Sequence, residues 1–144
     1  MKRGLLICGL AIAAALASAT VGAGAPARRA APAAAAWSSS WFVSPTHNIH
    51  CRWWGSQSLI ACMTQNDDYM TGVTVYGRAF VRDDAFNYTF PSGPTLSYGE
   101  YWTAHNASGA AVVRCWSRST GMTCRSLLTS RGFFISRESY RLYN

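Results

Sequence analysis

The chain has 144 residues and a formal net charge of +7, and 49% of its residues are hydrophobic. After the first 36 residues there is about one domain's length of chain, which is enough to bury a core. Nine arginines and six acids lie in that part, so its charge is only about +3, and the arginines are dispersed. A nucleic-acid binder normally carries a concentrated basic stripe, so we expect no nucleic-acid partner.

The first residues have the order of a secretory signal peptide. A positive start at residues 1–3 precedes an apolar stretch at 4–16 and the small residues at 17–19. The apolar stretch is shorter than the roughly 20 residues that cross a bilayer. We therefore expect residues 1–19, with Cys8, to be removed on export, so that the protein is secreted and has no stable membrane span. A retained membrane anchor is the alternative.

A change of composition marks the start of the folded part. Residues 20–36 are mostly Ala, Gly and Pro with two arginines, and they contain no aromatic residue. Such a segment has little to bury and is expected to be a disordered tether. All 19 aromatic residues follow it, which predicts a single secreted domain over residues 37–144.

Cysteine spacing predicts two disulfides. Removal of Cys8 leaves an even number in an exported domain, which indicates disulfide bonds: Cys51, Cys62, Cys115 and Cys124. The midpoint of each close pair falls in a turn-like segment, 55–58 or 118–121, so each pair would face its partner across a hairpin. We predict Cys51–Cys62 and Cys115–Cys124, in two hairpins that resemble copies of one unit. A four-cysteine zinc site would need tighter spacing, so no metal or cofactor is expected.

The remaining sequence indicates short strands. Runs of β-branched and aromatic residues alternate with turn residues, and no window has a helical period. We expect an all-β fold, a small disulfide-stapled sandwich or barrel of short antiparallel strands. Strands are predicted, besides the two hairpins, at residues 73–76, 86–90, 96–98, 132–136 and 140–143.

Several motifs occur in a recognisable order. Residues 42–51 read Phe-Val-Ser-Pro-Thr-His-Asn-Ile-His-Cys, 96–99 read Leu-Ser-Tyr-Gly, and 121–124 read Gly-Met-Thr-Cys. Gly-Phe at 132–133 and Ser-Arg at 136–137 lead to Tyr140. This order resembles a family of small secreted bacterial proteins, mainly actinobacterial and of uncharacterised activity, which opens Phe-x-Ser/Thr-Pro-Ser-Gly-Asn-Ile-x-Cys. The resemblance implies secretion and disulfides, and it supplies no activity.

The chain departs from that family at three places. His47 stands where the family usually has Gly, and Arg131 stands where it usually has His. Fuller members of the family also have cysteines in the middle segment, whereas this chain has none between Cys62 and Cys115. The analogy is therefore weaker over residues 64–94.

The histidines suggest one catalytic alternative. His47 or His50 together with a carboxylate would give an acid–base or metal site. The third histidine of the chain is His105. The carboxylates that could complete the site are Asp67, Asp68, Asp83, Asp84 and Glu100. Residues three apart on a strand face opposite sides, and adjacent aspartates are typical of turns. There is no nucleophile elbow, phosphate loop or dinucleotide motif. An enzyme is therefore not expected, and a small secreted hydrolase remains the alternative.

Tryptophans are the most informative functional feature. Trp53 and Trp54 are adjacent, so on a strand one of them must leave the core face. We interpret Trp116 and Phe133 as core residues. The leading hypothesis is a non-enzymatic module that binds a cell-envelope glycan or an extracellular protein through an aromatic and arginine-lined face. The candidate ligand-binding residues are Trp53, Trp54, Arg52, His47 and His50. An inhibitor of a secreted enzyme, presenting the tips 55–58 and 118–121, is a further alternative.

Overall fold

The computed structural model describes residues 39–65, 69–83 and 92–144. The chain divides into Met1–Ala30 and Ala31–Asn144, and all the described residues belong to the second unit. The predicted signal peptide, the tether and the strand at 86–90 lie outside the described residues, as do Trp37, Asp67, Asp68 and Asp84. Among the residues that are described, no helix is long and apolar enough to cross a membrane.

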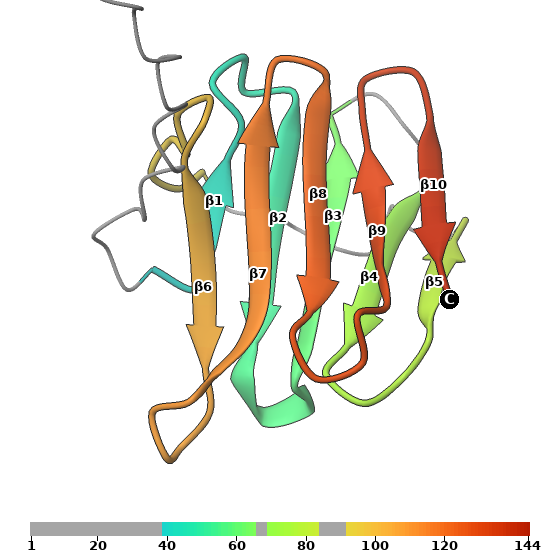
Figure 1. Cartoon of the computed structure of the whole chain (residues 1–144). Helices are drawn as coiled ribbons and strands as arrows, with labels where there is room; N and C mark the ends of the chain where they lie inside the picture. The colour runs from blue at the N-terminus through green and yellow to red at the C-terminus, as the bar shows by residue number, and fades with distance from the viewer. Residues whose placement is uncertain (1–38, 66–68, 84–91) are drawn as a thin grey trace, which may run out of the picture. The chain divides into compact units, whose positions relative to one another are not determined.

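The fold is all-β, as predicted, and has two antiparallel five-stranded sheets (Figure 1). Each sheet is a meander, with strand orders β1-β2-β3-β4-β5 and β10-β9-β8-β7-β6. A short 3₁₀ turn, η1, follows β2 at Gly55–Gln57. The strands are β1 (Trp41–Val43), β2 (Ile49–Trp54), β3 (Leu59–Thr64), β4 (Met70–Thr74), β5 (Ala79–Arg82), β6 (Tyr101–His105), β7 (Ala111–Arg118), β8 (Gly121–Ser126), β9 (Gly132–Ile135) and β10 (Tyr140–Tyr143).

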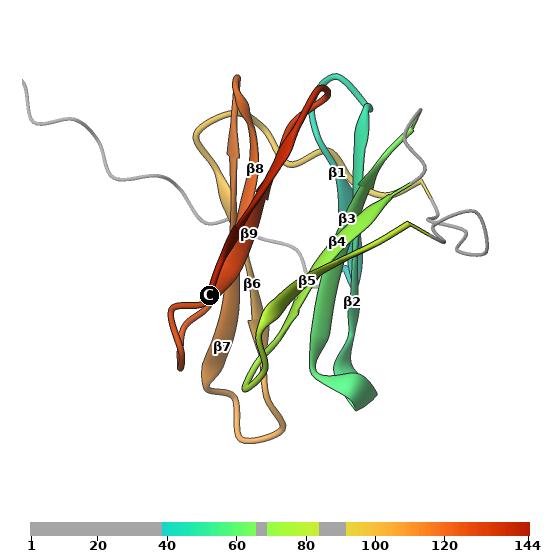
Figure 2. The same cartoon turned by 90° about the vertical axis from the view of Figure 1, so that its right-hand side faces the viewer.

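The two sheets pack face to face as a sandwich (Figure 2). Successive side chains on a strand point to opposite faces, so each strand gives alternate residues to the core. On β7 the inward residues Val113, Cys115 and Ser117 are buried, and the residues between them are not. One core cluster joins both sheets, with Phe42 and Ile60 from the first and Phe133 from the second.

Each predicted disulfide is present and joins the second and third strands of its own sheet. Cys51 is bonded to Cys62 between β2 and β3, and Cys115 to Cys124 between β7 and β8. The equivalent position in both sheets agrees with the interpretation of two similar hairpins. The sulfur atoms of Cys62 and Cys124 are 3.9 Å apart at the centre of the core. Zinc binds cysteine as the thiolate, and the sulfurs of all four cysteines are bonded in pairs. In this state the four cysteines are therefore not a zinc site.

Other predicted strands need correction. Of the run predicted at 73–76, only residues 73–74 belong to a strand, β4, which starts at Met70 and ends at Thr74. Residues 96–98 were predicted as a strand but form none, and the preceding residue, Thr95, makes an isolated parallel bridge with Val43. The backbone of this segment covers the edge of β1, because Val43 N–H donates to the Pro94 carbonyl and Leu96 N–H donates to the Val43 carbonyl. Strands β1, β5 and β6 were not predicted.

A buried hydroxyl also connects the two sheets. The Ser126 hydroxyl, at the end of β8, donates to the carbonyl of Val75, the residue just after β4, with an oxygen–oxygen distance of 2.6 Å. The same oxygen accepts hydrogen bonds from the backbone N–H groups of Leu128 and Thr129, both at 3.2 Å. The turn that leads into β9 is therefore held to the opposite sheet.

Candidate binding site

The structure keeps three of the five predicted ligand-binding residues on one surface and separates the other two from it. His50, Arg52 and Trp54 alternate along β2 and so share the outer face of the first sheet. Arg52 and Trp54 lie on the outer face of the first sheet, where the guanidinium carbon of Arg52 is 5.0 Å from the centroid of the Trp54 ring. Trp53 points the other way, packs against the core and lies 6.4 Å from Trp102 between ring centroids. The two adjacent tryptophans thus face opposite sides, as the alternation predicts, and they do not form one surface.

The outer face of the first sheet is already partly packed. Ala61 and Met70 are buried on it, although they point away from the main core. The side chains of Trp54, Met63 and Phe80 pack against them in a second cluster. The Trp54 ring therefore packs against other residues of the same sheet. This makes Trp54 a weaker candidate for a ligand platform than the sequence suggested.

Among the described residues, the histidines are not brought together with a carboxylate. His47 is exposed in the β1–β2 turn, and its backbone carbonyl accepts a hydrogen bond from His50 Nε2 at 2.9 Å. Asp83 is exposed just after β5. The cavity that His105 lines contains no carboxylate, and the one that Glu138 lines contains no histidine. The hydrolase alternative has no supporting geometry within the part of the chain that is described.

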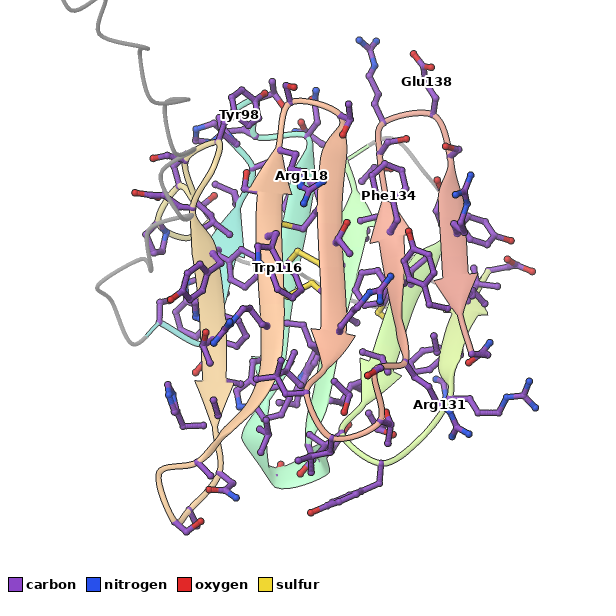
Figure 3. The ribbon with its side chains drawn as sticks, in the orientation of Figure 1. Tyr98, Trp116, Arg118, Arg131, Phe134 and Glu138 are labelled. Carbon is purple, nitrogen blue, oxygen red and sulfur yellow. A yellow bond between two sulfur atoms is a disulfide. The ribbon has the colours of Figure 1, made fainter. Side chains whose placement is uncertain are left out.

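The outer face of the second sheet is different in character. Cross-strand pairing places its outward residues in two rows that run across all five strands. The first row is Tyr101, Trp116, Thr123, Phe134 and Arg141, and the second is Thr103, Arg114, Arg125, Gly132 and Tyr143. Together with Arg118, at the end of β7, these rows form what we call the arginine–aromatic face. Trp116, Arg118 and Phe134 project from it in Figure 3.

Two arginines of this face lie over aromatic rings. The guanidinium carbon of Arg114 is 4.5 Å from the Tyr101 ring centroid and 6.0 Å from that of Trp116. That of Arg125 is 4.3 Å from the Tyr143 ring centroid, two strands away. Gly132 lies between Arg125 and Tyr143 in the row and leaves the space that the arginine crosses. The Nε of Arg114 also donates to the Thr103 hydroxyl oxygen at 3.4 Å. A guanidinium held over a ring directs the N–H groups of its edge away from the ring, where they can bind an oxyanion.

Like charges face each other on this surface. Arg114 and Arg125 are directly opposite in the β7–β8 register. As the structure describes them, strands β6 to β10 contain no Asp or Glu. Like charges at directly opposed positions destabilise a sheet. Stacking over rings offsets this cost in the folded protein, and two positive charges held side by side are suited to binding a negative ligand.

Two adjoining hollows lie on the same face. One, of about 320 Å³, is lined by Trp116, Arg118 and Arg125 among others. The second, of about 310 Å³, is lined by Arg118, Phe134 and Arg141 among others. Arg118 borders both, so the two hollows form one shallow, positively charged track.

The sequence interpretation of Trp116 was wrong, and that of Phe133 was right. Phe133 is fully buried, whereas Trp116 is partly exposed on the arginine–aromatic face. The signal was available: Cys115 must face the core for its disulfide, so its neighbour must point outward. The dispersal of the arginines was also misleading, because four strands of alternating residues bring Arg114, Arg125 and Arg141 to one surface.

Searches against known protein families, curated proteins and solved structures found no match to this chain.

Proposed function

We propose that this protein is a secreted, non-enzymatic binding module that holds an anionic glycan of the cell envelope on its arginine–aromatic face. The opposed pair Arg114 and Arg125, on five strands without an acid, is the observation that carries the proposal. Two disulfides in a small domain, together with the export signal read from the sequence, support a location outside the cytoplasm.

The ring contacts favour an anionic ligand over a neutral one. A neutral sugar would need bare ring faces on which to stack, but Arg114 lies over Tyr101 and Arg125 lies over Tyr143. Both guanidiniums are held in place before binding, which lowers the entropy that ordering them would cost. The ligand class that matches this arrangement has repeated oxyanion groups, such as carboxylates along a polysaccharide.

The test compares three polymers and two variants of the oxidised chain. Polygalacturonate is the anionic glycan, pullulan is its neutral counterpart, and a single-stranded oligothymidylate is the nucleic-acid probe. We expect polygalacturonate to bind in a salt-dependent way and pullulan not to bind. Arg125→Gln should weaken binding about tenfold, while Arg78→Gln, an exposed position in the β4–β5 turn, should change it by less than about twofold.

Stability measurements separate a binding role from a structural one. Arg125→Gln removes a like-charge contact as well as a ring contact, so the free energy of unfolding should stay within about 0.5 kcal/mol of the wild type. Equal losses of binding in Arg125→Gln and Arg78→Gln would contradict the proposal, because the effect would then reflect net charge alone. Tighter binding of oligothymidylate than of polygalacturonate would also overturn it and identify a nucleic-acid partner.

A further inference from the structure

A polar cavity of about 440 Å³ lies at one end of the sandwich. The β1–β2 turn, the turn before β6, the β7–β8 turn and the β9–β10 turn all contribute to its wall. Tyr98 and Glu138 mark this end in Figure 3, and Arg131 lies at the opposite end. We call it the end cavity. Its volume is within the range of small-ligand sites.

The segments with the recognisable motifs meet at the end cavity. Asn48 comes from the opening motif, Tyr98 from the Leu-Ser-Tyr-Gly segment and Arg137 from the Ser-Arg segment. They are far apart in the chain and share no strand. The departure at Arg131 does not affect the cavity, because that residue is at the other end of the sheet.

Much of each motif is explained by folding alone. Gly99 and Gly121 have φ values of 85° and 142°, which residues with a side chain rarely adopt. Leu96 and Phe133 are fully buried in the core. The Ser44 hydroxyl accepts a hydrogen bond from Ile49 N–H at 3.1 Å and so closes the β1–β2 turn. None of these residues needs a ligand to account for it.

Three motif side chains have no such structural role. Within the described part of the chain, the side chains of Asn48, Tyr98 and Arg137 make no hydrogen bond or ion pair. Tyr98 is 48% exposed, although it is a large aromatic residue. All three side chains line the end cavity. The motif residues that have no evident role in folding therefore lie around the same cavity.

The chemistry of the lining selects the ligand. Two arginines, Arg118 and Arg137, and a single carboxylate, Glu138, leave one net positive charge. Hydroxyl groups such as those of Thr46 and Thr120, with the Asn48 amide, both donate and accept hydrogen bonds, as sugar hydroxyls require. The ring of Tyr98 offers a surface for a pyranose. A singly charged sugar fits this set better than a neutral or a doubly charged ligand.

We infer that the end cavity binds a carboxylated pyranose at the end of the anionic glycan, an inference that rests on the proposed function. Arg118 borders both the end cavity and the hollows of the arginine–aromatic face. The two regions are therefore continuous. The last sugar occupies the cavity, and the following units lie on the face.

The experiment uses trigalacturonic acid, its neutral analogue maltotriose, and polygalacturonate, with binding measured by calorimetry. Tyr98→Ala and Arg137→Gln alter the cavity, and both side chains are exposed, so the fold should be retained. Tyr76→Ala, 75% exposed in the β4–β5 turn, and Arg131→Gln at the opposite end are the matched controls. We expect each cavity variant to bind trigalacturonic acid at least about tenfold more weakly, and each control to bind within about twofold of the wild type.

The outcomes distinguish this inference from the proposed function. If Tyr98→Ala and Arg137→Gln bind trigalacturonic acid like the controls, the cavity assignment is overturned. Polygalacturonate binding that still depends on Arg125 would then leave the proposed function intact. Maltotriose binding as strong as that of trigalacturonic acid would overturn the choice of a carboxylated sugar. If the wild type binds neither acidic probe, both ideas fail.

Discussion

Two buried serines allow a sharp test of how hydrogen bonds hold the sheets together. Ser117 and Ser126 are both 1% exposed, and each lies on an inner face of the second sheet. The Ser126 hydroxyl bonds to the Val75 carbonyl of the other sheet and accepts two backbone N–H groups. The Ser117 hydroxyl is buried and has no partner in the described part of the chain. Substitution by alanine removes the same atom from both sites.

The expected costs differ because the partners differ. Ser126→Ala leaves the buried Val75 carbonyl unpaired and frees two N–H groups near the surface, so it should cost about 2–3 kcal/mol. Ser117→Ala removes a hydroxyl that lost its water on folding and gained no partner. It should therefore be neutral or stabilise by up to about 1 kcal/mol. The two melting temperatures should differ by about 10 °C in a domain of this size.

Denaturant unfolding of the oxidised protein, followed by circular dichroism, measures both values. The slope of the free energy against denaturant should be the same in both variants and the wild type, since neither changes the surface exposed on unfolding. If the two variants are destabilised equally, within about 0.5 kcal/mol, the reasoning is refuted. The hydrogen bond between the sheets would then contribute no more than the packing of the serine oxygen, which both variants lose.

Three further predictions concern backbone and disulfides. Gly121 has a φ of 142°, and Gly121→Ala would place a Cβ against the Ile135 carbonyl oxygen. We expect this variant to lose at least about 2 kcal/mol of unfolding free energy, measured with denaturant. A loss below about 0.5 kcal/mol would contradict the prediction. His47→Gly should raise the unfolding free energy by about 0.5–1 kcal/mol because φ is 59°, and a decrease would be inconsistent with backbone strain there. The double variant Cys51→Ala, Cys62→Ala removes a disulfide that spans 11 residues and restricts the unfolded chain. Its free energy of unfolding should fall by about 3 kcal/mol, because the unfolded chain gains entropy. A fall of less than about 1 kcal/mol would argue against this entropic explanation.

The sequence predicted the parts of the fold that covalent or local chemistry determines. A disulfide in a hairpin sets the register of both strands, so Cys51–Cys62 and Cys115–Cys124 were enough to place four strands. The last strand was also predicted with its observed bounds, since Tyr140–Tyr143 follows a polar turn. The backbone of His47 was not predicted, since its φ of 59° is a conformation that favours Gly and no local pattern indicates it.

What could not be predicted depends on contacts between distant segments. Strands β1 and β5 are short, three and four residues, so an alternating pattern has little length in which to emerge. The arginine–aromatic face arises from the register of five strands, which no local pattern contains. The end cavity needs four turns to meet, and only the fold brings Asn48, Tyr98 and Arg137 together.

The meander order of the two sheets has a consequence for how the chain folds as it is made. Every strand pairs only with its neighbours in sequence within a sheet, and each disulfide spans 11 or 9 residues of its own hairpin. Contacts of such short range close quickly compared with those of a Greek key. The first sheet can pair and oxidise before the second has emerged, but its apolar inner face stays uncovered until then. The second half of the chain therefore acts as a folding partner for the first, and truncation after β5 should yield an aggregating product with a correctly formed first disulfide.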